Sequence, residues 1–262
     1  MSRDIGGKPQ LALIHGWGLG SAVWQPVVEP LSRHYHVRLV DLPGYGASPD
    51  ADDDDAEFSA AAFDETAQAV VDALPHPITL CGWSLGAMLA MRAALLAPQR
   101  VAGLVLVGAT ASFTQRTGWP EAQTPALLDS FSESIALQPE QALQRFVALL
   151  CQGDSQARSL TRTLRAGLRN APVPHSKVLN RGLHWLREVD LRALLPALST
   201  RSLLIHGEND ALNPLAAARR VSEMLPDARL RVFAGAGHAP FLADPQRFIE
   251  LLDDFRDAHT IS

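Results

Sequence analysis

The chain has 262 residues, 47% of them hydrophobic, and this length suits one large α/β domain or a domain that carries an insertion. A formal net charge of -5 argues against nucleic acid as a general partner, and no apolar run reaches the roughly 18 residues that would cross a membrane. A polar N-terminus without the apolar centre of a signal peptide, and two cysteines without metal-ligand spacing, predict a cytoplasmic protein that binds no metal.

The first part of the chain alternates short apolar runs with stretches of helix formers. The apolar runs predict strands over residues 11–14, 36–41, 78–81 and 101–107. The stretches between them predict helices over residues 24–32, 58–74 and 87–96. Such alternation is typical of a mostly parallel sheet that is covered by helices on both faces. Six acids between Asp50 and Glu57 predict a solvated loop, with a cation site as the remote alternative.

The alternation stops between about Ser112 and Asp190. No convincing strand pattern occurs there, and five prolines interrupt a series of helical patterns. A connection of this length without strands is unusual inside a compact domain. The alternation resumes with strands over residues 201–206 and 229–233 and helices over residues 216–225 and 245–255. We therefore expect one sheet-based core, residues 1–111 and 191–262, and an inserted helical lid, residues 112–190.

The most informative short motif is Gly82-Trp83-Ser84-Leu85-Gly86, which has the form G-x-S-x-G. The bare pattern also occurs by chance in turns, but here it stands between a predicted buried strand and a predicted helix. A serine held on a sharp turn between those elements leaves no room for a Cβ two residues before or after it, which explains both glycines. We interpret Ser84 as a nucleophile at the amino end of a helix.

A serine hydroxyl needs a base to take its proton, and the base needs an acid to hold it in one tautomer. Asp210 follows the strand at 201–206, and His238 follows the strand at 229–233. Glu208 competes with Asp210 for the role of the acid. We favour Asp210 because it follows the turn and precedes a helix that begins with proline. Each residue alone is unremarkable, but their order and their places after strands predict a Ser-His-Asp triad.

The same reaction needs backbone N–H groups that stabilise the oxyanion of the tetrahedral intermediate, an effect of about 3 kcal/mol per donor. The residue after the nucleophile, Leu85, is expected to supply one donor, and Trp17 in the glycine-rich turn after the first strand is expected to supply the second. The remaining histidines, His206 among them, show no convergent spacing, and we assign them no role. His15 is interpreted as structural.

One stretch has a single-sign charge pattern. Residues 141–187 contain eight lysines and arginines and one acid, Asp154. Four of the arginines fall within an arc of about 60° on one helix: Arg158, Arg162, Arg165 and Arg169. Three leucines face the other way: Leu160, Leu164 and Leu168. An ordinary solvated face usually mixes both signs, so this stripe indicates a dock for an anionic partner, with a solvated face as the alternative.

Longer motifs resemble a known family. The general ones are HGWG at 15–18, DLPGYGAS at 41–48, GWSLG at 82–86 and GHAPF at 237–241. More specific are RFVAL at 145–149 and VLNRGLHWLREVDLR at 178–192, both inside the predicted lid. Over nearly its whole length the chain resembles the α/β-hydrolase esterases. Within them it closely resembles the pimeloyl-[acyl-carrier-protein] methyl ester carboxylesterases of biotin biosynthesis.

The resemblance implies an α/β-hydrolase fold and hydrolysis of a methyl ester on an acidic acyl-carrier protein, with release of methanol. It places the catalytic triad on Ser84, Asp210 and His238. It places the substrate contacts on Trp17, Ser84, Leu85, Phe146, Val147, Ala148, Leu149 and Leu150. It places the carrier-binding arginines on Arg145, Arg158 and Arg162, while Gln141 stands where the family has a further basic residue. It implies no cofactor and no membrane, and we expect a monomer.

Three other functions stay open at this stage. A general short-chain carboxylesterase or a C–C bond hydrolase could use the same fold and the same triad. A binding module with this fold but without catalysis would have no need of all three triad residues, which this chain retains. Ser84 argues against a dehalogenase, because that reaction needs a carboxylate nucleophile.

Overall fold

The computed structural model describes residues 7–46, 48, 59–170 and 172–258. The acidic run from Asp50 to Glu57 lies outside the described residues. Six parallel strands form one sheet in the order β2-β1-β3-β4-β5-β6. They are β1 (Gln10–Ile14), β2 (His36–Val40), β3 (Ile78–Trp83), β4 (Val101–Val107), β5 (Ser202–Gly207) and β6 (Ala228–Phe233).

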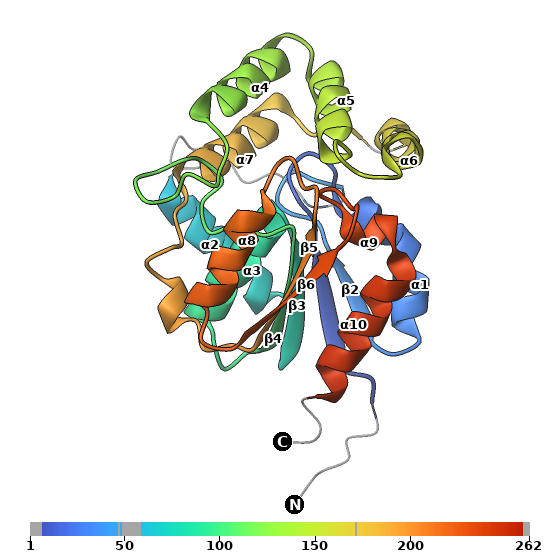
Figure 1. Ribbon diagram of the computed structural model, residues 1–262, viewed down its shortest axis with the longest axis vertical. Helices are drawn as coiled ribbons and strands as arrows, with labels where there is room; N and C mark the ends of the chain where they lie inside the picture. Colours follow the sequence, from blue (N-terminus) through green and yellow to red (C-terminus); the bar gives the residue numbers. More distant parts are fainter. Residues whose placement is uncertain (1–6, 47, 49–58, 171, 259–262) are drawn as a thin grey trace, which may run out of the picture.

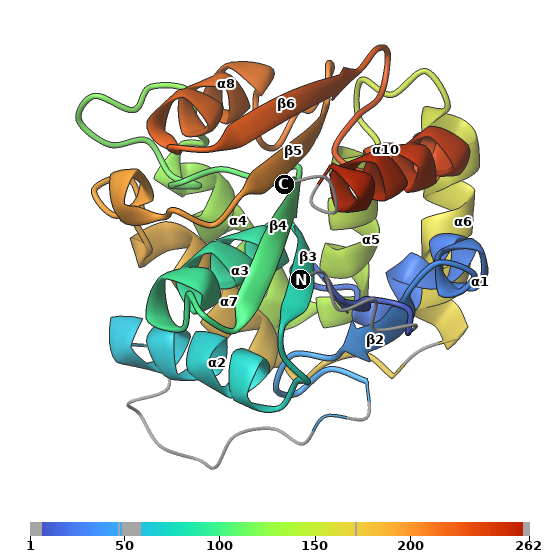
Figure 2. The same cartoon turned by 90° about the horizontal axis from the view of Figure 1, so that it is seen from below.

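Helices cover both faces of this sheet, as Figure 2 shows. One face carries α2 (Ala60–Asp72), α3 (Leu85–Leu96) and α8 (Leu215–Met224), and the other carries α1 (Gln25–Ser32) and α10 (Pro245–Asp257). Three short helices complete the core: η1 (Ser21–Trp24), η3 (Leu195–Ala197) and α9 (Pro240–Ala243). The central strands β3, β4 and β5 are almost continuously apolar because both of their faces are buried. No helix of the described residues is long and apolar enough to span a bilayer.

Between β4 and β5 the chain forms four consecutive helices. They are α4 (Pro125–Leu137), α5 (Pro139–Leu150), α6 (Ala157–Asn170) and α7 (Ser176–Glu188). Figure 1 shows them together above the carboxyl edge of the sheet. An isolated antiparallel bridge between Ser112 and Asp190 joins the two ends of this segment. α7 packs against α4 and against α2 of the core, and α6 packs against α5 and η1.

The expected fold class is confirmed, and the expected strands and helices differ from the observed ones mainly at their ends. β3 continues to Trp83 because Gly82 and Trp83 still pair with β4. α3 begins at Leu85, so the turn between strand and helix consists of Ser84 alone. α2 begins at Ala60, not at residue 58, because the Ser59 hydroxyl caps it by accepting the Ala62 N–H at 3.1 Å.

The sheet order brings the loops that matter to one place. β1 lies between β2 and β3, so the chain leaves β1 toward one side of the sheet and leaves β3 toward the other. Loops that diverge in this way open a crevice at the carboxyl ends of the strands, where ligands bind in α/β proteins. The loop after β1 contains Trp17, and the turn after β3 is Ser84. The topology therefore places the predicted nucleophile at the switch point of the sheet.

Candidate active site

Ser84 occupies a strained turn between β3 and α3. Its backbone dihedral angles are φ 57° and ψ −118°, and it is the only non-glycine residue with positive φ among the described residues. A Cβ on Gly82 would overlap the Gly86 carbonyl, and a Cβ on Gly86 would overlap the carbonyls of Ile14 and His15. Both glycines of the motif are therefore required by close backbone packing, as the sequence predicts.

The loop after β1 passes directly beside Ser84. A Cβ on Gly16 would lie 3.1 Å from the Ser84 Cβ. The next residue, Trp17, is fixed because its Nε1 donates to the Leu179 carbonyl at 2.8 Å. Leu85 is the first residue of α3, where N–H groups lack acceptors within the helix. The two predicted oxyanion donors thus belong to backbone segments that meet at Ser84, and their role stays a prediction.

Asp210 and His238 form a buried hydrogen-bonded pair. His238 Nδ1 lies 2.7 Å from Asp210 Oδ2, and neither side chain is exposed. Asp210 Oδ1 accepts the N–H groups of Leu212 and Asn213 at 2.9 Å each. Burial opposes ionisation of Asp210, but the charge of a protonated His238 and the hydrogen bonds to the carboxylate outweigh it. The pKa of Asp210 therefore lies below its usual value of 3.8.

Glu208, the competing acid, lies elsewhere. It is exposed, and its Oε2 accepts the Gly235 N–H at 3.0 Å. The structure thus places Asp210 rather than Glu208 against the imidazole of His238.

The backbone holds His238 on several sides. Its N–H donates to the Leu150 carbonyl at 3.3 Å, and its carbonyl accepts Trp83 Nε1–H at 2.8 Å. Gly108 packs so closely that a Cβ there would lie 3.1 Å from the imidazole ring. His238 Nε2 is buried without a hydrogen-bond partner among the described residues. Since Asp210 engages Nδ1, Nε2 is the ring nitrogen free to accept a proton from a nucleophile.

His206 is a member of this cluster that sequence reasoning missed. It lies in β5, only 1% exposed, and its Nε2 is 3.3 Å from Asp210 Oδ2 and 2.7 Å from the Asn213 carbonyl oxygen. Burial lowers the pKa of His206, although Asp210 opposes that shift. The only sequence signal was its place at the strand end, four residues before Asp210.

The predicted substrate stretch on α5 faces this centre in part. Phe146 packs edge-on against Trp17 with ring centroids 4.6 Å apart, and Val147 and Leu150 are buried. Leu149 is half-buried, whereas Ala148 is exposed on the outer face of α5. Four of the five predicted positions therefore point inward or lie at the boundary of the core, and Ala148 does not.

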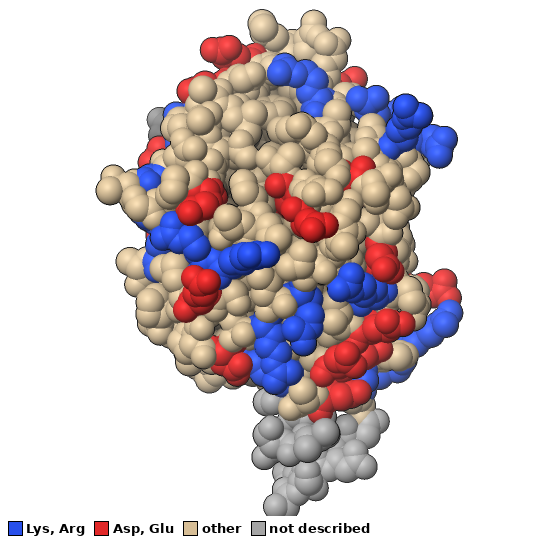
Figure 3. Space-filling view, in the orientation of Figure 1, with Lys and Arg blue, Asp and Glu red and all other residues tan. Residues whose placement is uncertain are grey.

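The predicted docking arginines lie on the outer surface of α5 and α6. Arg145, Arg158 and Arg162 are exposed, and the blue side chains at the upper right of Figure 3 lie over the position of α6 in Figure 1. α6 buries Leu160 and Leu164 on its opposite face. Arg165 departs from the stripe, because it is half-buried and donates to the Gln144 carbonyl at 3.4 Å.

The remaining basic residues of the stretch do not all face solvent. Arg181 on α7 is only 3% exposed and donates to the Pro43 carbonyl at 2.5 Å. Arg187 pairs with Asp129 of α4. The local excess of positive charge therefore divides into a docking candidate on α5 and α6 and structural arginines on α7.

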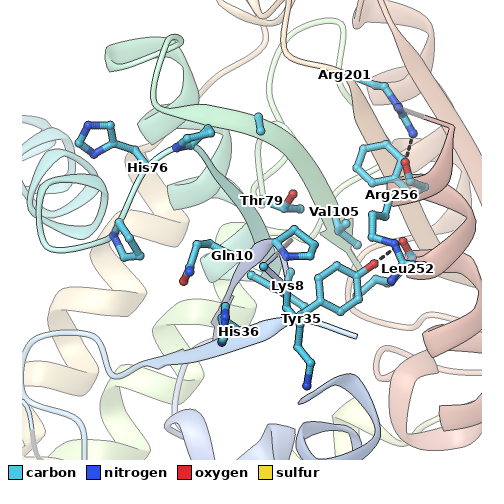
Figure 4. Close-up of a pocket in the computed structure, with 17 residues that line it drawn as sticks. Lys8, Gln10, Tyr35, His36, His76, Thr79, Val105, Arg201, Leu252 and Arg256 are labelled. Carbon is cyan, nitrogen blue, oxygen red and sulfur yellow. Dashed lines mark hydrogen bonds between the residues drawn. The ribbon is translucent and has the colours of Figure 1, made fainter. Parts of the chain in front are cut away.

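Two other features have no part in this centre. Within the described ranges, no group of three or more His, Cys, Asp or Glu side chains is arranged to hold a metal ion. A cavity of about 560 Å³ opens at the amino ends of the strands, near Thr79 and Arg201 (Figure 4). It lies at the opposite edge of the sheet from Ser84, and the Arg201 guanidinium there packs on Phe255 and donates to its carbonyl.

Comparison with known proteins agrees with this geometry. The alpha/beta hydrolase fold family matches residues 9–245, and the chain belongs to this family. The chain is 42% identical to a pimeloyl-[acyl-carrier protein] methyl ester esterase of Nitrosomonas europaea, over 95% of this chain and 96% of the relative. It is 38% identical to the Serratia marcescens protein of the same name, over 97% and 96% of the two chains.

Solved structures show the same architecture. An esterase from Exiguobacterium antarcticum superposes with a TM-score of 0.82 at 26% identity, over 95% of this chain and 91% of that one. A bromoperoxidase from Bacillus anthracis superposes with a TM-score of 0.84 over 96% and 92%, but at 21% identity it supports the fold alone.

Proposed function

We propose that this protein is a serine carboxylesterase that hydrolyses the methyl ester of pimeloyl-[acyl-carrier protein] in biotin biosynthesis. The observation that carries the chemistry is the buried 2.7 Å pair of His238 and Asp210, which shares the carboxyl edge of the sheet with the strained turn at Ser84. The observation that supports the substrate is the 42% identity to a relative of that name over nearly both full lengths.

The reaction follows from the roles of three side chains. His238 Nε2 takes the proton of the Ser84 hydroxyl, and the serine oxygen attacks the ester carbonyl. The N–H groups of Trp17 and Leu85 stabilise the resulting oxyanion. His238 returns the proton to the departing methoxide, which leaves as methanol, and then activates a water that hydrolyses the acyl-serine. Asp210 holds the imidazole in one tautomer throughout, and the reaction needs no cofactor.

Residues 112–190 act in this proposal as a lid over the serine. Phe146, Val147, Leu149 and Leu150 supply its apolar inner surface, which suits an acyl chain. A cavity of about 240 Å³ extends from Gly18, next to Trp17, to Leu168 on α6. We infer that the acyl chain approaches Ser84 along this route, because it joins the predicted docking helix to the loop that carries an oxyanion donor.

The partner in this proposal is an acidic acyl-carrier protein that docks on α5 and α6. Arg158 and Arg162 have no carboxylate partner among the residues that the structure describes, and Arg145 donates only to the Ser134 hydroxyl, at 2.8 Å. Exposed cations that remain unpaired within their own protein are available to an anionic surface. Gln141 is also exposed on α5, so the docking face has one cation fewer than the resemblance implies.

We extend the proposal to a cytoplasmic monomer. Cys81 and Cys151 are both buried and free, as is usual in proteins of a reducing compartment. Sedimentation of the purified protein would test the monomer.

The substrate assignment is tested with the double variant Arg158→Glu/Arg162→Glu. We expect kcat/KM for the carrier-bound methyl ester to fall at least about tenfold, because two attractive charges become repulsive, while kcat/KM for a small butyrate ester stays within about twofold. The matched control is Arg219→Glu/Arg231→Glu, which makes the same charge change at exposed positions on α8 and β6. The control should leave both rates near wild type.

Two results would contradict the proposal. Wild-type activity on the small ester without preference for the carrier substrate would favour a general short-chain carboxylesterase. Equal losses in the two double variants would show that overall charge, and not the arginines of α6, governs the carrier reaction.

A further inference from the structure

We propose that His206 is a positioning residue that shares the carboxylate of Asp210 with His238 and thereby sets the basicity of His238. The inference rests on the proposed function, because it assigns a role in the same hydrolysis. His206 lies at the carboxyl end of β5, four residues before Asp210, and is 1% exposed. The triad motif does not include it, and its place at the end of a strand is its only sequence signal.

The contacts of His206 assign its tautomer. Nε2 faces two oxygens that can only accept, the Asn213 carbonyl at 2.7 Å and Asp210 Oδ2 at 3.3 Å. Nε2 must therefore carry the proton, which it donates to the Asn213 carbonyl while it lies beside Asp210 Oδ2. Nδ1 is buried without a partner among the described residues, which suits the unprotonated nitrogen. His206 thus stands as a neutral donor next to the acid of the triad.

The N–H group of His206 adds to the polar surroundings of the Asp210 carboxylate. Oδ1 accepts two backbone N–H groups, from Leu212 and Asn213, at 2.9 Å each. Oδ2 accepts from His238 at 2.7 Å, and His206 Nε2 lies 3.3 Å from the same oxygen. A carboxylate with three hydrogen-bond donors and a further N–H group beside it is held in orientation and remains ionised. Without His206, the oxygen that faces His238 would lose the second N–H group beside it.

His206 also connects to the other side of the His238 ring. The Asn213 residue that accepts from His206 donates its side-chain Nδ2–H to the Gly108 carbonyl at 2.6 Å. Gly108, at φ 54°, packs against His238, and a Cβ there would lie 3.1 Å from ring atoms Cε1 and Nδ1. The imidazole is therefore held between Asp210 and Gly108, and His206 and Asn213 link the two.

The other ionisable groups near His238 act at a different place. Asp154, in the turn after α5, accepts the Gly237 N–H at 2.8 Å, and Glu208 accepts the Gly235 N–H at 3.0 Å. Both bind the backbone of the loop and not the ring. Ser84 occupies the turn after β3, at the same edge of the sheet. Among these groups, His206 is the one that lies next to the carboxylate oxygen to which His238 is hydrogen-bonded.

The effect on His238 has a definite sign. The N–H group of His206, 3.3 Å from Asp210 Oδ2, offsets part of the negative charge on this oxygen, so a protonated His238 is stabilised less than by the carboxylate alone. Removal of His206 should therefore strengthen the interaction between the Asp210 carboxylate and a protonated His238. The acid limb of the pH profile, where His238 must lose its proton to act as a base, should then move to higher pH.

The test compares His206→Leu, which removes the donor, with His206→Gln, whose amide keeps one at similar reach. With a small butyrate ester, we expect His206→Leu to lower kcat/KM about tenfold and to move the acid limb up by about 0.5 to 1 pH unit. His206→Gln should return the limb toward its wild-type position. An acid limb that does not move in His206→Leu would overturn the proposal and leave a merely structural histidine.

A second measurement needs no variant and so does not depend on folding of the mutants. Nitrogen-15 NMR of the imidazoles in the wild-type protein should show His206 protonated at Nε2 and neutral across the active pH range. Protonation at Nδ1 would overturn the proposal. Because the kinetic test uses a small ester, a wild type that hydrolyses this ester but not the carrier substrate would refute the proposed substrate and leave the role of His206 testable.

Discussion

The loops at the carboxyl edge of the sheet and the helix α6 contrast in how they are held. Ser84, Asp210 and His238 are at most 7% exposed, and backbone groups fix each of them. α6 presents arginines to solvent, and its Leu168 lines three cavities, of about 450, 300 and 240 Å³. Bond-forming chemistry requires fixed distances, whereas docking of an acidic partner requires accessible charge. The loops at the carboxyl edge meet the first requirement, and α6 meets the second.

The two regions meet at the turn between α5 and α6. The Leu150 carbonyl accepts the His238 N–H, Asp154 accepts the Gly237 N–H at 2.8 Å, and the Ser155 N–H donates to the Gly235 carbonyl at 2.8 Å. The docking helix therefore begins where the loop of the predicted base is hydrogen-bonded. Substitutions away from this turn, in one region only, should affect catalysis or docking, but not both.

The largest effect is expected for Ser84→Ala. Loss of the nucleophile should reduce kcat/KM by about 10⁴-fold or more for carrier-bound and small esters alike. Carrier affinity, measured by calorimetry, should stay unchanged, because α6 is untouched. Labelling by a fluorophosphonate probe should occur in wild type and be lost in the variant. Residual activity above about 1% would exclude Ser84 as the nucleophile, and absence of labelling in wild type would favour a silent binding module.

Much of this contrast can be predicted from the sequence, because the patterns that indicate the strands and the triad residues are local. The strands are short apolar runs, and Ser84, Asp210 and His238 each lie in the loop or turn that follows one, so their meeting at one edge follows from parallel pairing. His206 could not be found this way. Its partners are a backbone carbonyl and a carboxylate whose positions depend on the turn after β5, and no pattern of residue types encodes them.

The same limit applies to the helices of residues 112–190. Periodicity predicted the orientation of α6 correctly for Leu160 and Leu164, which are buried. It did not predict that Arg165 bends back to the Gln144 carbonyl. Nor could it predict the burial of Arg181, because its acceptor, the Pro43 carbonyl, is 138 residues away in the sequence. Long-range contacts of single side chains leave no periodic trace.

The next effect is a dependence of the free energy of unfolding on pH. It arises from a histidine at the buried edge of the sheet and not from the exposed helix α6. His15 Nδ1 lies 2.7 Å from the Gly16 carbonyl, and Nε2 accepts the Leu42 N–H at 3.1 Å, so the ring must be neutral. Burial lowers the pKa of His15 from 6.5 to about 4, although the Gly16 hydrogen bond and Asp41 oppose the shift. His15 therefore binds a proton more tightly in the unfolded chain than in the folded protein.

The sign of the stability change follows directly. The contribution of His15 is present above pH 6.5 and is lost as the pH falls to about 4, by an amount of about 3 kcal/mol. Urea denaturation of wild type across this window should show the decline, and His15→Asn should flatten it. Asp210 acts in the same direction but only below its unfolded pKa of 3.8. If the free energy of unfolding declined equally in His15→Asn and in wild type, other groups would be responsible for the pH dependence.

The smallest effect compares two arginines from the same basic stretch. Arg181→Met should lower the free energy of unfolding by about 2 kcal/mol, because the buried guanidinium donates to the Pro43 carbonyl and lies over the Trp185 ring, 5.5 Å from its centroid. Arg158→Met, at an exposed position on α6, should change it by less than about 0.5 kcal/mol.

Kinetics should reverse this order. Arg158→Met is expected to raise KM for the carrier substrate, whereas Arg181→Met should leave the carrier KM unchanged at temperatures where the variant is folded. Denaturation midpoints and carrier kinetics on the two variants check both halves. If Arg158→Met destabilised the protein as much as Arg181→Met, α6 would be part of the packed core, and its arginines would lose their separate assignment to docking.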